Sequence, residues 1–277
     1  MQISIIIPVL DEAECIVALL QQLQPLRARG HEVILVDGGS KDGTVVLAEK
    51  LVDRLLMVPA GRARQMNAGA DAADGQMFWF VHADSGIPDR AEELIIKATL
   101  INPSCRRRPA SRSLQTVDPG IRRDDDIRRD DDIRRDDDIC RDDGKGINQR
   151  FLKSVTHGWG RFNVRLSGDS MLLRAVERLM NLRSRITGIA TGDQCIFVSR
   201  ALFERVGGYA DLPLMEDVDL SKRLKREQWP VCVPHTVTTS SRRWEQRGIV
   251  RTILLMWYLR LAWFLGVPAT RLATRYG

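Results

Sequence analysis

Cysteine is scarce in this chain of 277 residues, with five cysteines at positions 15, 105, 140, 195 and 232. Their number is odd and no two form a CxxC pair, which argues against a disulfide framework or a zinc cage and fits a reducing compartment. The N-terminus has no basic segment, and its apolar run is too short for a signal peptide. We therefore expect a cytoplasmic protein whose first residues form a buried strand.

The common glycine-rich nucleotide motifs are also missing. Neither the GxGxxG pattern of dinucleotide-binding proteins nor the GxxxxGK[ST] pattern of the P-loop occurs. The first predicted strand-to-helix turn also lacks the glycine-rich loop with Arg or Lys that is expected of a sugar nucleotidyltransferase. These absences argue against two large classes of nucleotide-binding protein and count against a nucleotidyltransferase.

Charge is distributed unevenly along the chain. There are 42 Lys and Arg against 36 Asp and Glu, a net charge of +6, yet residues 118–143 hold 12 Asp and 7 Arg. The rest therefore has 35 basic and 24 acidic residues, a net charge of +11, which is typical of a protein that meets phosphates, nucleic acid or an anionic membrane surface. Residues 118–143 repeat the hexapeptide IRRDDD, which builds no apolar stripe and lacks the glycine and glutamate of a calcium-binding loop. We predict a disordered insertion over 102–156.

The first hundred residues alternate between apolar β-branched runs and segments of helical spacing. Strands are predicted over 3–9, 32–37, 54–58 and 77–82, and helices over 12–29, from about residue 42, and over 62–73. This alternation predicts an α/β fold with a mostly parallel sheet. Ligands of such sheets bind outside the carboxyl ends of the strands.

Acidic residues follow three of these predicted strands. Glu12 comes after the first, Asp37 closes the second, and Asp84 comes after the fourth. A carboxylate at such a position accepts hydrogen bonds from a base or a ribose, or holds Mg²⁺ or Mn²⁺ against a diphosphate. Any one of them alone is more simply a turn residue, but three at one edge of the sheet indicate a nucleotide site.

Seven segments of the chain resemble family 2 glycosyltransferases in order and spacing. They are IIIPVLDEAE, VDGGSKDGT, GRARQMNAGA, FVHAD, TGDQCIFVSRALFERVGGY, LPLMEDVDLSKRL and SSRRWEQRG. The resemblance covers about 1–100 and 157–277 and implies the GT-A fold, a Rossmann-like sheet flanked by helices. The variants HAD, TGDQ and SSRRWE are most similar to a bacterial subgroup labelled arsenosugar-biosynthesis glycosyltransferases, which is described as similar to carotenoid enzymes of the diaponeurosporenoate type.

The resemblance divides the chain into four parts. It implies a nucleotide-sugar-binding half over 1–101, the insertion over 102–156, an acceptor-binding and catalytic half over 157–248, and a C-terminal apolar helix and tail over 249–277.

For the donor half, the resemblance implies that Asp37 contacts the base of the donor and that Asp84 binds the metal on its diphosphate. The other implied donor-side residues are Pro8, Glu12, Gly39, Ser40, Arg62, Arg64, Asn67 and His82. Simpler interpretations stay open: Asp37 caps its turn, Glu12 is an acidic residue in the first turn of a helix, and Arg62 and Arg64 are exposed on a helix. His82 stands where many members have an acidic residue. It is either a packed strand residue, the interpretation we favour, or an imidazole ligand of Mn²⁺.

For the acceptor half, the resemblance implies that Asp217 is the general base, with Glu216 orienting Asp217 or the acceptor. Gly192, Asp193 and Gln194 would line the acceptor pocket, and Arg243 and Trp244 would touch the diphosphate and the donor. The alternatives are a first helical turn for Glu216 and Asp217, a plain turn for 192–194, and a surface arginine stacked on a tryptophan for Arg243 and Trp244.

The segment 249–267, IVRTILLMWYLRLAWFLGV, is apolar around almost its whole circumference. Arg251 and Arg260 interrupt it, so we do not expect it to span a membrane. It is predicted to be a helix that is buried, lies at an interface or lies on a bilayer. Together with the basic charge, it favours peripheral attachment to the inner face of the cell membrane.

The function predicted from these features is inverting transfer of a sugar from a nucleotide-diphosphate sugar to a hydroxyl of a small or lipid-linked acceptor. UDP-sugar is the favoured donor by the resemblance, Mg²⁺ or Mn²⁺ is the expected cofactor, and nucleic acid is not an expected partner. Two alternatives remain, a nucleotidyltransferase and a non-catalytic protein that binds a nucleotide sugar or a membrane surface.

Overall fold

Seven strands form one sheet in the order β3-β2-β1-β4-β6-β5-β7. The computed structural model describes residues 1–100 and 158–276, so the insertion predicted for 102–156 lies outside the described residues. Among the described strands, β6 runs antiparallel to its neighbours and the other pairs are parallel. The strands are β1 (Ile3–Val9), β2 (Glu32–Asp37), β3 (Arg54–Met57), β4 (Met77–Phe80), β5 (Trp159–Leu166), β6 (Phe197–Ser199) and β7 (Val231–Thr239). The predicted α/β fold with a mostly parallel sheet is confirmed.

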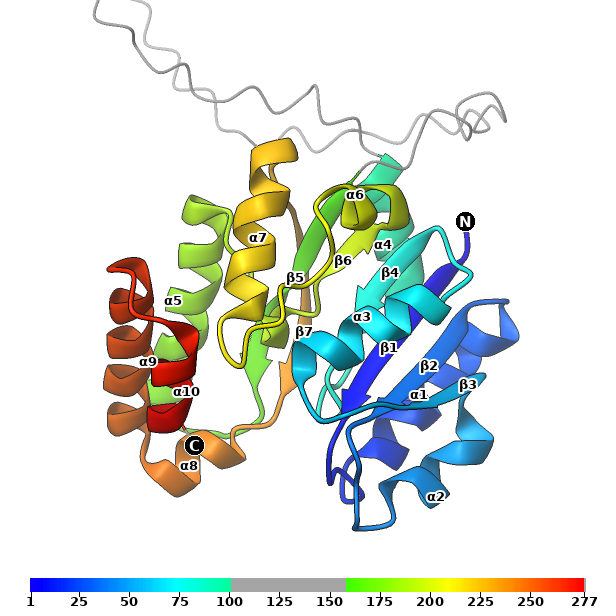
Figure 1. The fold of residues 1–277 in the computed structure, drawn as a ribbon, viewed down its shortest axis with the longest axis horizontal. Helices are drawn as coiled ribbons and strands as arrows, with labels where there is room; N and C mark the ends of the chain where they lie inside the picture. The colour runs from blue at the N-terminus through cyan, green and yellow to red at the C-terminus, as the bar shows by residue number, and fades with distance from the viewer. Residues whose placement is uncertain (101–157, 277) are drawn as a thin grey trace, which may run out of the picture. The chain divides into compact units, whose positions relative to one another are not determined.

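Helices cover both faces of the sheet (Figure 1). Side chains alternate along β1, so Ile5 and Ile7 pack under α1 (Ile16–Ala28) and α4 (Ala91–Leu100), whereas Ile6 faces the opposite layer. That layer holds α3 (Arg62–Ala72), α6 (Arg200–Arg205) and α7 (Glu216–Glu227). All three isoleucines are completely buried, and burial of one such side chain is worth about 1.5–3 kcal/mol.

The helix α3 lies very close to β1 because Gly69 has no side chain. A Cβ atom at this position would lie 2.4 Å from Cγ2 of Ile6 and 3.0 Å from Cγ2 of Val36. The short α2 (Thr44–Ala48) and η1 (Glu49–Leu51) follow β2 at the edge of the sheet.

The second half of the chain adds a group of helices beside β5 and β7. These are α5 (Met171–Thr187), α8 (Arg242–Arg247), α9 (Ile249–Phe264) and α10 (Ala269–Tyr276), and the turn η3 (Gly192–Gln194) precedes β6. Figure 1 shows α5, α9 and α10 side by side. One cluster of buried side chains joins α5 to β5 and α9, and a second joins α7 to α9 and α10.

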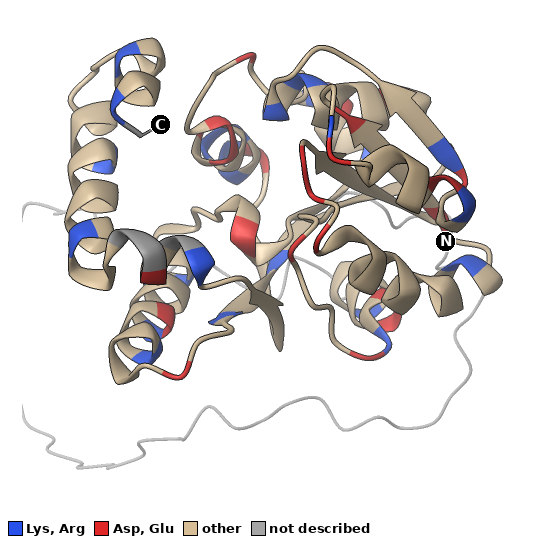
Figure 2. Cartoon of the chain, turned by 90° about the horizontal axis from the view of Figure 1, so that it is seen from below, with Lys and Arg blue, Asp and Glu red and all other residues tan. Residues whose placement is uncertain are grey.

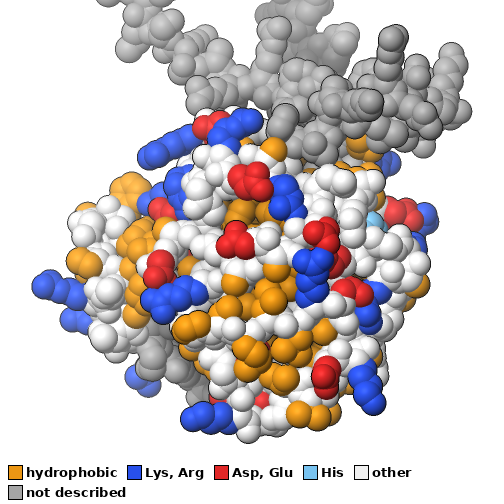
Figure 3. Space-filling view, turned by 45° about the vertical axis from the view of Figure 1, so that its right-hand side comes forward, with side chains coloured by type: hydrophobic (Ala, Val, Ile, Leu, Met, Phe, Trp, Pro, Cys, Tyr) orange, Lys and Arg blue, Asp and Glu red, His pale blue; other side chains and the backbone are white. Residues whose placement is uncertain are grey.

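The predicted C-terminal helix is therefore present as α9, and it is only partly buried. Thr252, Leu259 and Ala262 are buried on its inner side, whereas Trp257 is 63% and Phe264 78% exposed. Nowhere in 1–100 or 158–276 does a helix have both the length and the apolar composition needed to cross a membrane. On the face shown in Figure 3, basic and acidic side chains lie among apolar patches, so this face has no extended surface of one charge.

Candidate active site

A cavity of about 710 Å³ lies at the carboxyl ends of the parallel strands, between the two halves of the sheet. Seen from below, acidic residues gather in the loops near the middle of the molecule (Figure 2). Ten of the residues predicted from the sequence line this cavity, and they come from both halves of the chain: Pro8, Glu12, Arg62, His82, Asp84, Gly192, Asp193, Glu216, Asp217 and Trp244. The predicted site residues are therefore largely brought together by the fold.

The side of the cavity formed by residues 1–100 opens because the neighbouring strands β1 and β4 end at different heights. The pairing of β1 with β4 ends at Ile6, where the N–H of Val81 still donates to the carbonyl of Ile6 at 3.0 Å, but β1 itself continues to Val9. The chain after β4 turns across this edge, and the amide of Ser85 donates to the carbonyl of His82 at 3.1 Å. This turn carries Asp84 to the cavity wall, opposite the end of β7 with Thr239.

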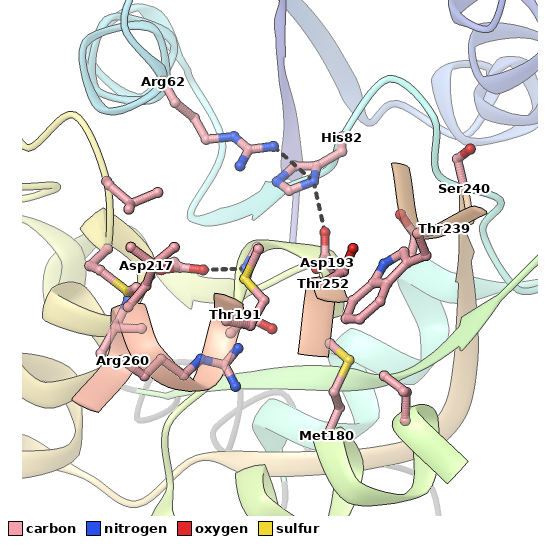
Figure 4. Close-up of a pocket in the computed structure, with 18 of the residues that line it drawn as sticks. Arg62, His82, Met180, Thr191, Asp193, Asp217, Thr239, Ser240, Thr252 and Arg260 are labelled. Carbon is pink, nitrogen blue, oxygen red and sulfur yellow. Dashed lines mark hydrogen bonds and ion pairs between the residues drawn. The ribbon is translucent and has the colours of Figure 1, made fainter. Parts of the chain in front are cut away.

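His82 is buried and sits between side chains of both halves. Its Nδ1 lies 3.1 Å from Nη2 of Arg62 and 3.7 Å from Oδ1 of Asp193 (Figure 4). On another side its ring is so close to the turn η3 that a Cβ on Gly192 would approach Nε2 to 2.6 Å. His82 is therefore a packed residue, and it also connects Arg62 in the first hundred residues with Asp193 in the second half of the chain.

Asp217 lies in the first turn of α7, and its carboxylate holds the turn η3 in place. The amide of Gly192 donates to Oδ2 of Asp217 at 2.8 Å, as Figure 4 shows, and the amide of Val218 donates to Oδ1 at 2.6 Å. A carboxylate has about four lone-pair positions, so each oxygen still has one left for a proton from a substrate. Met215, the residue before α7, has a φ of 68° and turns the chain so that both acidic residues meet the cavity.

Glu216 is the buried partner of this pair. Burial is the first cause that raises its pKa, to about 7, and the neighbouring Asp217 raises it further, whereas Arg62 acts in the opposite direction. Nη1 of Arg62 is 3.9 Å from Oε1 of Glu216. Near neutral pH this carboxyl group is therefore partly protonated, which reduces repulsion beside Asp217.

Three arginines of the cavity were not predicted from the sequence: Arg183, Arg260, and Arg242 at the start of α8. Arg183 belongs to α5 and Arg260 to α9, and both line the cavity. Figure 4 shows Arg260 reaching in beside Thr191. No motif marks Arg183 or Arg260, because Arg183 lies on an amphipathic helix, where an arginine is normally solvent-facing, and Arg260 lies in an otherwise apolar helix outside the recognised segments. Of these two, only Arg260 carried a signal, because it interrupts an apolar segment.

Three predicted residues lie at the turn after β2, outside the cavity. Asp37 is buried, and its Oδ2 accepts the amides of Gly39 at 2.8 Å and Ser40 at 2.9 Å, while the hydroxyl of Ser40 donates to Oδ1. Gly39 has a φ of 98°, a conformation that glycine adopts easily. Asp37 thus caps its own turn, and its contact with a base stays a prediction.

Three further predicted residues also lie outside the cavity. Arg64 pairs with Asp211 at 3.0 Å, and Asn67 exchanges two hydrogen bonds with the backbone of Tyr209. Gln194 is buried under η3, where its Oε1 accepts the amide of Thr191 at 3.3 Å. These residues shape the loops around the cavity. For Arg243, the structure describes the backbone in α8 but not the side chain.

Among the carboxylates of the cavity, Asp84 is the one that was predicted to bind a metal ion. Nowhere in the described parts of the chain do three His, Cys, Asp or Glu side chains form a group that could hold a metal ion. Mg²⁺ and Mn²⁺ also bind through one or two carboxylates completed by phosphate oxygens and water. Asp84 at the cavity wall fits this second arrangement, in which the diphosphate of a ligand supplies the remaining oxygens.

The sequence of the first half matches a known family. Residues 4–104 match the family described as Glycosyl transferase family 2. A PGL/p-HBAD biosynthesis glycosyltransferase from Mycobacterium tuberculosis is 35% identical over 91 residues, which cover 30% of this chain and 36% of that protein. The match thus spans about a third of the length of the relative.

Solved structures resemble the described chain over most of its length. The mannosyltransferase PcManGT from Pyrobaculum calidifontis, in complex with GDP-Man and Mn²⁺, has a TM-score of 0.54 at 17% identity, covering 94% of this chain and 60% of that one. TarS 1–349 from S. aureus, in complex with UDP-GlcNAc, has a TM-score of 0.53 at 15% identity, covering 87% of this chain and 58% of that one. At such identities the likeness shows the fold alone. Residues 4–104 thus match glycosyl transferase family 2, and the described chain shares the fold of these solved structures.

Proposed function

We propose that this protein transfers a sugar from a nucleotide-diphosphate sugar to a hydroxyl group of an acceptor, with inversion at the anomeric carbon. The observation that carries the proposal is the position of Asp217, whose carboxylate lines the cavity that Asp84 and Arg62 border from the donor half. A base and a diphosphate-binding edge in one cavity are what such a transfer needs.

The donor is proposed to bind along the edge formed by β1, β4 and the turn after β2. Pro8 and Glu12 line the cavity at the end of β1, and Arg62 faces it from α3. The guanidinium of Arg62 would stabilise negative charge on the departing diphosphate, and Asp84 would hold the divalent ion bound to it. When present, that ion supplies Lewis-acid stabilisation of the leaving group.

Asp217 is proposed to remove the proton of the acceptor hydroxyl. Inversion requires in-line attack, so the base must face the side of the sugar opposite the leaving group. Asp217 projects from α7, whereas Asp84 follows β4 in the donor half. The hydrogen bond from Gly192 fixes the orientation of the carboxylate before substrate arrives, which avoids a reorganisation cost during the reaction.

Glu216 is proposed to act through its neighbour. As a partly protonated group with a pKa of about 7 beside Asp217, it adds less than one full negative charge next to the proposed base. Arg62 approaches Glu216 at 3.9 Å and Nδ1 of His82 at 3.1 Å, so the occupation of the donor site and the charge at the base are connected through one side chain.

The proposal also covers the nucleobase of the donor and the chemical class of the acceptor. PcManGT was solved with GDP-Man and TarS with UDP-GlcNAc, so structures of this fold accommodate either base. We favour a UDP-sugar because the sequence resembles enzymes that use it, and we keep the arsenosugar-biosynthesis type as the proposed subgroup. A small or lipid-linked hydroxyl compound is the proposed acceptor.

Peripheral attachment to the inner face of the cell membrane is also part of the proposal. The side chains of Leu254, Trp257, Leu261 and Phe264 on α9 are each at least 60% exposed. An apolar helix face of this kind can lie at the boundary between head groups and acyl chains.

One observation favours a second function, a non-catalytic protein that binds nucleotide sugars. By the resemblance of the sequence to family 2 glycosyltransferases, His82 stands where many members have an acidic residue, and it is engaged with Arg62 and Asp193. A diphosphate could then be held by arginine without an efficient reaction.

Titration with UDP, GDP and their sugars, by calorimetry with and without Mn²⁺, tests the donor site first. We expect metal-dependent binding of either the uridine or the guanosine nucleotides. We also expect that the nucleotide sugar releases its nucleotide in the presence of hydroxyl acceptors. Binding of a nucleotide sugar with no hydrolysis or transfer to any acceptor favours the non-catalytic function, and no binding by a folded sample overturns both.

A further inference from the structure

Arg183 carries a positive charge into the wall of the cavity. Its Nε and Nη2 atoms are buried and have no hydrogen-bond partner among the described residues. Burial is the first cause that lowers its pKa, to about 10, and the nearby Arg260 lowers it further, whereas Asp217 raises it. Unpaired buried guanidinium groups are unfavourable, so such a group is normally retained where an anion completes it.

The neighbouring charges leave this part of the cavity positive. Arg183 and Arg260 line the same cavity from α5 and α9, and the charges of both Arg260 and Asp217 act on Arg183. Both oxygens of Asp217 already accept backbone amides, from Gly192 and Val218. Two guanidinium groups and one engaged carboxylate leave room for one further negative charge.

The wall beside these arginines is apolar. Val176 and Met180 of α5 are buried there, and Ile253 and Met256 of α9 complete the lining. Leu179 and Trp257 line the cavity and are also 56% and 63% exposed. An apolar path therefore leads from the surface between α5 and α9 to the two arginines.

We propose that Arg183 and Arg260 form an acceptor subsite for an anionic group, phosphate or carboxylate, carried on an apolar chain. This inference rests on the proposed function, because it assigns the acceptor side of the same cavity. The anion would lie against the two guanidinium groups, the apolar chain would leave between α5 and α9, and the reacting hydroxyl would face Asp217. Charge-assisted hydrogen bonds to guanidinium would orient the acceptor, so this pair would select acceptors by charge.

The test uses three short probes of equal chain length: hexyl phosphate, hexanoate and hexanol. Calorimetric titration of the full chain is expected to show at least about tenfold tighter binding of one or both anions than of hexanol, because hydrogen bonds to charged groups are stronger than those between neutral groups; tenfold corresponds to about 1.4 kcal/mol. Tighter binding of hexyl phosphate assigns a phosphate-bearing acceptor, and tighter binding of hexanoate a carboxylate-bearing one. Equal binding of all three probes overturns the inference.

Two variants and one control locate the effect. Arg183→Gln and Arg260→Gln are each expected to remove the preference for anions while leaving hexanol binding unchanged. Arg178→Gln, which changes an exposed residue of α5 that does not line the cavity, is expected to keep the preference. A thermal unfolding measurement checks that each variant folds, and Arg183→Lys, which keeps the charge, is expected to retain part of the preference. An Arg183→Gln protein that still prefers anions contradicts the inference.

A competition experiment separates this subsite from the donor site. Hexyl phosphate is expected to bind equally well with and without saturating UDP or GDP. Displacement by the nucleotide would mean that the arginines bind the diphosphate of the donor, and the inference would be wrong although the proposed function would stand. If no nucleotide or nucleotide sugar binds to the folded protein, the proposed function fails instead, whatever the probes show.

Discussion

The two halves of this molecule reach the same cavity in different ways. In the donor half, Glu12, Arg62 and Asp84 lie within or directly after elements that follow each other closely along residues 1–100. In the acceptor half, α5, η3, α7 and α9 contribute residues separated by up to about 80 positions, from Val176 to Arg260. The family match ends at residue 104. A site made from local turns leaves a recognisable sequence pattern, whereas a site assembled from separate helices does not.

The largest effect is expected when the proposed general base, Asp217, is removed. We expect Asp217→Asn to lower the turnover number by roughly 10²- to 10⁴-fold, the contribution of general-base catalysis, without changing nucleotide affinity. Steady-state rates of sugar transfer and calorimetry provide the two measurements. Asp219→Asn is the matched control, because this aspartate lies on the same helix, pairs with Arg223 and does not line the cavity. Unchanged turnover in Asp217→Asn would exclude it as the base.

Replacement of Asp84 should weaken nucleotide binding. We expect Asp84→Asn to weaken Mn²⁺-dependent nucleotide binding by at least about tenfold, a loss within the range seen when groups around a metal are altered. Affinity measured without metal should change little. Asp89→Asn, an exposed position in the same connection between β4 and α4, serves as control. An equal loss with and without Mn²⁺ would show that Asp84 binds the nucleotide directly.

The raised pKa of Glu216 predicts a pH dependence of stability. The folded protein holds this proton up to about pH 7, whereas the ordinary carboxyl value is 4.5. The folded state therefore binds more protons than the unfolded state in this interval, and stability falls as the pH rises from about 4.5 to 7. The loss is on the order of 3 kcal/mol at most. Chemical denaturation at several pH values should show that Glu216→Gln removes this slope. A variant with the same pH profile as the native protein would contradict the assignment.

The contact between the two halves predicts a smaller effect. Gly192→Ala places a Cβ 2.6 Å from the ring of His82, which must then shift from Arg62 and Asp193. We expect a loss of about 1–3 kcal/mol in the free energy of unfolding, as for other overpacked sites. Gly86→Ala is the control, because its Cβ would meet Thr238 at an ordinary 3.6 Å. If both variants have the same unfolding curve, the ring of His82 moves aside without a cost in free energy, and the prediction is wrong.

Predictions from the sequence succeeded for the position of residues at strand ends more than for the orientation of their side chains. The positions of Pro8, Glu12 and Asp84 could be predicted because a parallel strand places the residues after it at a known edge. Asp37 was also placed correctly at that edge, yet its carboxylate is directed into its own turn rather than into the cavity. Alternation and strand ends indicate where a residue lies, but the orientation of a side chain depends on its hydrogen-bond partners.

The acceptor half could be predicted only where a short motif exists. Asp217 and Gly192 were recognised from such motifs, but the hydrogen bond that joins them across 25 positions was not visible in the sequence. Arg183 carried no signal, and Arg260 was visible only as an interruption of an apolar segment. Their position in the cavity depends on the packing of α5 and α9 against the sheet, which is a non-local property of the fold.

The sequence by itself determined the α/β alternation, the acidic edge at the ends of β1 and β4 and the family of residues 4–104, because each depends on contiguous residues whose periodicity or motif is read directly. The tertiary structure alone decided which of these groups share the cavity, that Glu216 is buried beside Asp217, and that Arg183 and Arg260, from separate helices, line the same cavity as Asp217. Burial and charge balance are sums over neighbours that are distant in the chain, and only the folded arrangement brings those neighbours together.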